Sequence, residues 1–100
     1  MNLRFTDGAE TDVENVLSWY RERGHDLADQ FLAALDQCLD AIQVNPQASA
    51  EVYRDIRRAL LRRFPYCVFY IISGQEVVVL ACLHGHRDPK VWQGRRITRP

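Results

Sequence analysis

The chain has 100 residues, of which 47% are hydrophobic and 26% are charged, and its 13 basic and 13 acidic residues give a formal net charge of zero. This length is typical of one domain with a single core. The composition excludes intrinsic disorder, which requires few apolar residues and a high net charge. We therefore expect residues 1–100 to form one domain.

The zero net charge hides an uneven distribution along the chain. Residues 1–53 contain ten acidic and three basic residues, a net charge of −7, whereas residues 54–100 contain ten basic and three acidic residues, a net charge of +7. Nine of the ten basic residues in the second half are arginines, which suit bidentate contacts with phosphate or carboxylate. The asymmetry predicts an anionic partner for the second half.

Several other classes of protein are excluded by what the sequence lacks. No apolar run approaches the roughly 18–20 residues of a membrane span, and the N-terminus has early acidic residues and no apolar export signal. The cysteines Cys38, Cys67 and Cys82 are odd in number and form no zinc-binding pattern. We expect free thiols in the reducing cytoplasm, no metal, no cofactor and no membrane partner.

The N-terminal part predicts a strand followed by a helix. Residues 2–6 alternate polar and apolar side chains, which is typical of a short strand. Asp7 and Glu10 have the spacing of a capping box, so we expect Asp7 to be the N-cap of the first helix. We expect that helix to end at Gly24.

A second helix is predicted from Asp26 to Asn45, because the residue before Pro46 avoids the helical region. Its apolar residues form one stripe over about four turns: Leu27, Phe31, Ala34, Leu35, Cys38 and Ile42. The connection between the two helices is short, so they should form an antiparallel hairpin.

The pattern of the chain changes after a predicted loop at residues 47–51. Residues 56–64 fit either a strand or a helix, and the strand-like run after Pro65 favours a strand. Alternation along such a strand places its four arginines in two pairs on opposite faces, namely Arg58 with Arg62 and Arg57 with Arg63.

Residues 66–72 and 77–83 are rich in aromatic and β-branched side chains and predict two antiparallel strands. Gly74 fits the first central position of a two-residue turn between them. This turn would pair Ser73 with Glu76, and the same register gives three further pairs: Ile71 with Val78, Phe69 with Leu80, and Cys67 with Cys82.

Both faces of this strand hairpin are apolar, which is typical of strands buried on both sides. Two helices can cover only one face of a small sheet. We therefore expect the C-terminal segment, a second subunit or a partner protein to cover the rest. Asp88 and Pro89 predict a short helical turn within that segment.

Two segments carry a family resemblance. They are Arg57–Tyr66, which leads into Tyr70, and Val79–Pro89, which ends in Leu-His-Gly-His-Arg-Asp-Pro. Together with the order β-α-α-β-β-β, they resemble the RelE/ParE superfamily of toxins from bacterial type II toxin–antitoxin modules, in its ParE-like, plasmid-stabilisation branch. The resemblance spans nearly the whole chain. It implies an α+β fold in which a helical hairpin packs on one face of a small, curved, mainly antiparallel sheet.

The resemblance also implies a function. Such toxins inhibit growth and are neutralised by an antitoxin, which would fill grooves of the toxin by helix-in-groove and strand-addition contacts. ParE-like members inhibit DNA gyrase and need no catalytic centre, whereas RelE-like members cleave mRNA in the ribosome. We expect a cytoplasmic toxin that inhibits an essential target, DNA gyrase, in the ParE-like way. The alternatives are a ribosome-dependent mRNA endoribonuclease and a detoxified binding module.

Candidate site residues follow from these alternatives. A ribonuclease needs a base, an acid and positive charge on the phosphate, which His84, His86 and Arg87 could supply. The candidates for binding a target or phosphate are Arg57, Arg58, Arg62, Arg63 and Arg87. The candidates for binding an antitoxin are Tyr66, Tyr70, Val79 and Trp92. The chain lacks the lysine pair near the second strand and the C-terminal tyrosine of the RelE pattern, which argues against RelE-like catalysis.

Overall fold

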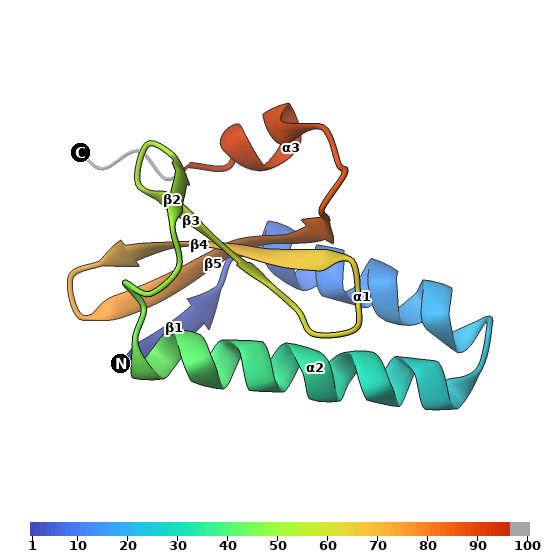
Figure 1. Cartoon of the computed structure of the whole chain (residues 1–100). Coiled ribbons are helices and arrows are strands. Elements are labelled where there is room, and N and C mark those ends of the chain that lie inside the picture. Colours follow the sequence, from blue (N-terminus) through green and yellow to red (C-terminus); the bar gives the residue numbers. More distant parts are fainter. Residues whose placement is uncertain (97–100) are drawn as a thin grey trace.

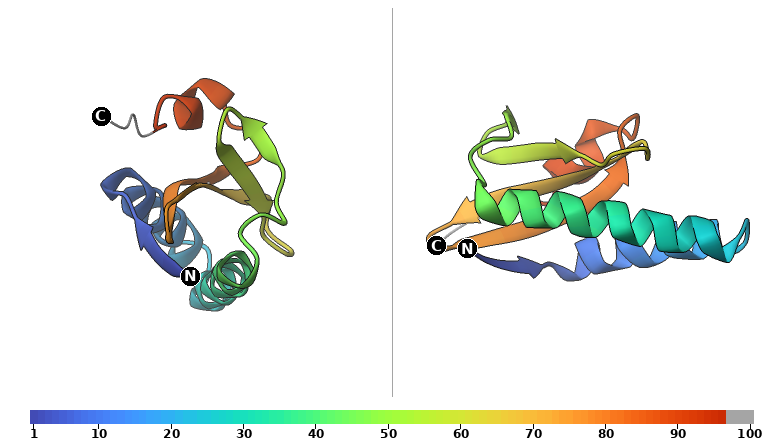
Figure 2. Two further views of the ribbon diagram at one scale, coloured as in Figure 1. Left: turned by 90° about the vertical axis from the view of Figure 1, so that its left-hand side faces the viewer. Right: turned by 60° about the horizontal axis from the view of Figure 1, so that its bottom comes forward.

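A five-stranded mixed sheet carries two long helices on one face and a short helix on the other (Figures 1 and 2). The computed structural model describes residues 1–96. The helices are α1 (Asp7–Arg21), α2 (His25–Val44) and α3 (Pro89–Gln93). The strands are β1 (Asn2–Phe5), β2 (Glu51–Tyr53), β3 (Ile56–Leu60), β4 (Tyr66–Ser73) and β5 (Glu76–His84).

The strand order in the sheet is β1-β5-β4-β3-β2. β1 runs parallel to β5, and the other neighbouring strands are antiparallel. The predicted α+β architecture, with a helical hairpin on a mainly antiparallel sheet, is confirmed. The short strand β2 was not predicted; it begins at Glu51, the last residue of the expected loop.

The helical hairpin forms as predicted, with three corrections. α1 ends at Arg21, three residues before the predicted end at Gly24. Thr6, not Asp7, is the N-cap of α1, because the Thr6 hydroxyl accepts the Ala9 backbone N–H at 3.2 Å. α2 begins after Gly24, whose φ of 149° favours glycine, and ends before Asn45 as expected. Leu27 does not join the apolar stripe of α2, since it is 38% exposed.

The pairing of β4 with β5 follows the predicted register only near the turn. Gly74 has a φ of 62°, and the predicted pair of Ser73 with Glu76 is present. Farther from the turn the predicted partners are wrong, since Phe69 pairs with Ala81 and Cys67 pairs with Leu83. A β-bulge shifts the register here, because β5 has one more residue than β4 at this point.

The bulge reverses which face each later residue of β5 contacts. Cys82 packs in the core under α1 and α2, whereas Ala81 and Leu83 pack on the opposite face. That opposite face is covered by α3, whose Trp92 stacks on Phe69 with ring centroids 4.4 Å apart. Of the three covers predicted for this face, the C-terminal segment is the one that the structure shows (Figure 2).

The edge of β5 changes partner halfway along its length. β1 pairs with β5 as far as Val79, and the Thr6 backbone N–H donates to the Val79 carbonyl at 3.0 Å. Beyond that point α1 replaces β1, so the backbone groups of Leu80 and Cys82 on this edge need other partners.

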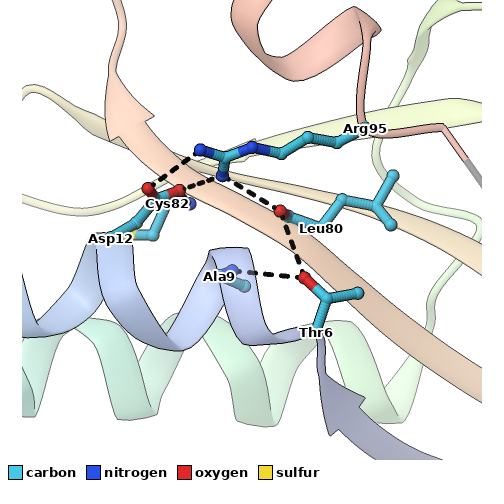
Figure 3. A network of polar contacts seen from close by, with 6 residues as sticks. All are labelled: Thr6, Ala9, Asp12, Leu80, Cys82 and Arg95. Carbon is cyan, nitrogen blue, oxygen red and sulfur yellow. Dashed lines mark hydrogen bonds and ion pairs between the residues drawn. The ribbon is translucent and has the colours of Figure 1, made fainter.

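Side chains supply those partners (Figure 3). The Asp12 carboxylate accepts the Cys82 backbone N–H at 3.0 Å, and the Arg95 guanidinium binds both oxygens of that carboxylate. Arg95 also donates to the Leu80 carbonyl at 3.2 Å, which the Thr6 hydroxyl approaches at 3.4 Å. The buried Asp12 therefore joins α1, β5 and the C-terminal segment through one carboxylate.

The cysteines are free thiols, as predicted. Burial raises the pKa of Cys82 from 9.0 to about 12, and the neighbouring Asp12 carboxylate acts in the same direction. Burial also raises the pKa of Cys38 to about 11. These thiols are protonated at neutral pH and belong to the core rather than to a reactive site.

We expect Asp12→Ala to lower the free energy of unfolding by about 2–3 kcal/mol, because it leaves the Arg95 guanidinium and the Cys82 N–H without their partner. Urea denaturation measures this change. Glu76→Ala is the control, since it removes an exposed ion pair to Arg4 and should cost less than about 1 kcal/mol. Equal losses in the two variants would contradict the assigned role of Asp12.

The Cys82 thiol predicts a pH dependence of stability. Above pH 9 this thiol ionises in the unfolded chain but keeps its proton in the folded protein, whose pKa is about 12. Rising pH therefore favours unfolding, by about 1.4 kcal/mol per pH unit for this group. Between pH 9 and 11, Cys82→Ala should lose stability less steeply than the wild type in urea titrations. Identical slopes for the two proteins would refute this prediction.

Candidate functional site

A groove of about 550 Å³ runs between α2 and β3, and a second hollow of about 320 Å³ continues it toward the β3–β4 loop. On the α2 side the wall consists largely of small residues, including Ala33, Ala34, Cys38 and Ala41. These short side chains leave the space that larger residues would fill. The charged residues that line the two hollows are all basic: Arg58, Arg62 and Arg63.

The β3 side of the groove offers an open strand edge. β2 covers only the beginning of β3. The last backbone hydrogen bond on this edge joins the Arg58 N–H to the carbonyl of Ala50, the residue before β2. Within residues 1–96, no strand pairs with Leu60 on this side, and its side chain is 67% exposed. An open edge beside an exposed apolar side chain can accept an extended segment of another chain.

Arg62 and Arg63 lie in a loop rather than in a strand, which corrects the prediction that they occupy opposite faces. β3 ends at Leu60 because Leu61 turns into the core, where its N–H donates to the Tyr66 carbonyl at 3.0 Å. Arg63 has a φ of 69°, an unusual conformation for a residue with a side chain. Both arginines are therefore exposed on the same loop.

The loop is anchored after these arginines as well as before them. Phe64 packs edge-on against Tyr20 and Phe31, with ring centroids 5.4 and 5.6 Å apart. The Pro65 carbonyl accepts the Gly85 N–H at 2.7 Å. Rigid anchors on both sides lower the conformational entropy that a partner of the arginines would have to remove.

Arg57 has a different role from the other predicted target-binding arginines. Its guanidinium donates to the carbonyls of Gln47 and Ser49 at 3.1 and 2.6 Å and lies 3.8 Å from the Glu51 carboxylate. These contacts hold the connection between α2 and β2. The structure therefore gathers Arg58, Arg62 and Arg63 at the groove and leaves Arg57 to a structural task.

Two of the three candidate nuclease residues, His84 and Arg87, line a separate pocket of about 210 Å³ between α1 and the end of β5, whereas His86 is not part of its lining. Its lining includes Trp19, Tyr66, His84 and Arg87. The His84 Nδ1 accepts the His86 backbone N–H at 3.0 Å, so the neutral ring carries its proton on Nε2. None of the groove arginines lines this pocket.

The four residues predicted to bind an antitoxin do not form an exposed surface. Tyr70 and Val79 are completely buried, and Trp92 is 6% exposed. The Tyr70 hydroxyl donates to the Pro46 carbonyl at 2.6 Å, which ties it to the end of α2. Only Tyr66 is half-buried and lines a pocket, so a partner would have to open the core to reach the other three.

Two exposed side chains were missed by the sequence analysis. Leu60 and Leu61 are adjacent in the predicted strand of residues 56–64, where neighbouring side chains would point to opposite faces, so one of them could have been expected at the surface. Trp19 is 47% exposed, and its position between Ser18 and Tyr20 on α1 gives no comparable signal.

Among the described residues, no helix is long and apolar enough to cross a membrane. In the same part of the chain, no group of three or more His, Cys, Asp and Glu side chains is placed to hold a metal ion.

Comparison with known proteins gives concordant results. Residues 3–89 match the family model described as the ParE toxin of the type II toxin–antitoxin system parDE. The chain is 30% identical over 88 residues to proteins named Toxin ParE2 from two strains of Mycobacterium tuberculosis, CDC 1551 / Oshkosh and H37Rv. That alignment covers 87% of this chain and 84% of the relative.

The fold is also found among solved structures. A chain of the structure titled "Chromosomal ParDE TA system from P. aeruginosa" matches with a TM-score of 0.73 and 20% sequence identity. The match covers 84% of this chain and 95% of that chain. At this identity the likeness concerns the fold alone.

Proposed function

Because the chain belongs to the ParE toxin family of type II toxin–antitoxin systems, we propose that it inhibits DNA gyrase without catalysis and that its antitoxin binds in the groove between α2 and β3. Family membership makes the chain the toxin component of such a module and implies an antitoxin as its partner. The gyrase target, the cytoplasmic location and a single toxin domain of residues 1–100 are parts of the proposal.

The shape and charge of the groove support its assignment as the antitoxin site. An extended antitoxin segment could pair with the open edge of β3 at Leu60 and bury that side chain. Arg58, Arg62 and Arg63 line the groove and, within residues 1–96, have no ion pair to neutralise them. Carboxylates of an acidic, amphipathic segment would complement these guanidinium groups.

The separation of basic groups supports inhibition by binding rather than by catalysis. Ribonucleolytic cleavage needs a base, an acid and positive charge around one phosphate. His84 and Arg87 line the pocket beside α1, whereas Arg58, Arg62 and Arg63 line the groove beside α2. One substrate phosphate could thus contact either the groove arginines or His84 and Arg87, but not both groups.

The second candidate function is a ribosome-dependent mRNA endoribonuclease. It is favoured by the proximity of His84 and His86, whose ring centroids are 5.4 Å apart, and by Arg87, which lines the same pocket as His84. This alternative requires that His84→Ala abolishes mRNA cleavage in cells while the variant still folds and binds its antitoxin. A third candidate, a detoxified binding module, requires that expression without antitoxin leaves growth unaffected.

A supercoiling assay tests the proposed target. Purified protein should inhibit gyrase-catalysed supercoiling of relaxed plasmid at micromolar concentration, because a non-catalytic inhibitor acts by occupying its target. Adding the antitoxin in equimolar amount should restore supercoiling. Unchanged supercoiling at micromolar protein would reject gyrase as the target, and mRNA cleavage in growth-arrested cells would favour the ribonuclease.

Charge reversal in the groove tests the antitoxin site. Arg62→Glu should weaken antitoxin binding by at least about tenfold, because it replaces an attractive contact by a repulsive one. Calorimetry at two salt concentrations should also show a smaller salt dependence for the variant. Arg21→Glu is the matched control, since Arg21 is an exposed arginine of α1 that does not line the groove. Equal affinities for both variants would place the antitoxin elsewhere.

A further inference from the structure

The pocket beside α1 has the features of a second protein-binding surface. Trp19 lines it and is 47% exposed, which is unusual for so large an apolar side chain. Tyr66, His84 and Arg87 line it as well. Tryptophan, tyrosine and arginine are the residues that contribute most often to the hot spots of protein interfaces.

Trp19 is exposed and yet held in place. The Arg23 guanidinium lies 3.5 Å from the centroid of its ring and donates to the Trp19 carbonyl at 2.8 Å. The ring also packs edge-on against Tyr20, with centroids 5.0 Å apart. A large aromatic side chain that is already ordered loses little conformational entropy when a partner covers it, so it is suited to anchoring an interface.

The polar groups of the pocket favour an acidic ligand. Arg87 is a cation, and His84 Nε2 carries a proton because Nδ1 is already an acceptor. Burial raises the pKa of the Tyr66 hydroxyl, which therefore remains a donor at neutral pH. The carboxylate in the lining, that of Asp12, is neutralised by Arg95. The charge that remains for a ligand is positive.

We propose that this pocket is the surface by which the toxin holds its protein target, with an aspartate or glutamate side chain of the target bound at Arg87 and an apolar segment packed on Trp19. The pocket shares no lining residue with the groove proposed for the antitoxin. This inference rests on the proposed function only in requiring a protein target; that target need not be gyrase.

Two substitutions test the surface. Trp19→Ala and Arg87→Glu should each raise the toxin level needed for half-maximal growth arrest at least about tenfold, the effect of losing one interface hot spot. Each variant, purified as the complex with its antitoxin, should keep antitoxin affinity within about twofold. Arg87→Lys should retain part of the activity because it keeps the positive charge. Arg21→Glu, on the same helix as Trp19 but outside the pocket, should arrest growth like the wild type.

The possible failures separate this inference from the proposed function. Wild-type toxin that arrests growth without affecting supercoiling rejects gyrase, while loss of arrest in Trp19→Ala still supports the pocket. Full growth arrest by both variants at equal expression would overturn the pocket as the target surface. Loss of antitoxin binding in both would assign it to the antitoxin instead. Binding of a labelled single-stranded oligonucleotide that both variants abolish would assign it to nucleic acid.

Discussion

The contact between Asp12 and Arg95 supports the rest of the structure. β1 leaves the edge of β5 after Val79, and a bare strand edge at that depth would leave backbone groups unsatisfied. The Asp12 carboxylate and the Arg95 guanidinium satisfy the Cys82 N–H and the Leu80 carbonyl in place of a strand. Because Asp12 belongs to α1 and Arg95 follows α3, the same contact fixes both ends of the chain to the sheet (Figure 3).

The C-terminal segment that Arg95 fixes explains why the apolar strand hairpin needs no partner to cover it. Trp92 fills the face opposite the long helices, and Arg96 binds the Asp55 carboxylate at 2.8 Å in the β2–β3 turn. The apolar hairpin, which first suggested a partner, is therefore satisfied within residues 1–96. A partner is instead indicated at the groove, where Leu60 is exposed beside a strand edge that no strand within residues 1–96 covers.

The sequence predicted the features that neighbouring residues determine, namely helices and the tight turn. It failed where two strand registers or two strand ends fit the same hydrophobic pattern. The turn at Gly74 fixed the pairs beside it, and the sequence located the start of α1 and both ends of α2 to within about one residue, whereas α1 ends at Arg21 rather than at Gly24. The bulge at Leu80 could not be predicted because both faces of β5 are apolar, so a shift of one residue leaves the hydrophobic pattern unchanged. The predicted positions of Arg62 and Arg63 were wrong because Leu61 and Phe64 both pack into the core, and β3 ends at Leu60.

Ion pairs distinguish the structural arginines from those available to partners. Arg57, Arg95 and Arg96 belong to the basic half of the chain, and each meets an acidic residue: Glu51, Asp12 and Asp55. The net charge of +7 therefore overstates what an anionic partner meets. Four of the remaining arginines line hollows of the surface: three line the groove, and Arg87 lines the pocket beside α1. A toxin that must recognise both an antitoxin and a target can thus use separate basic surfaces, so that a substitution at one need not disturb the other.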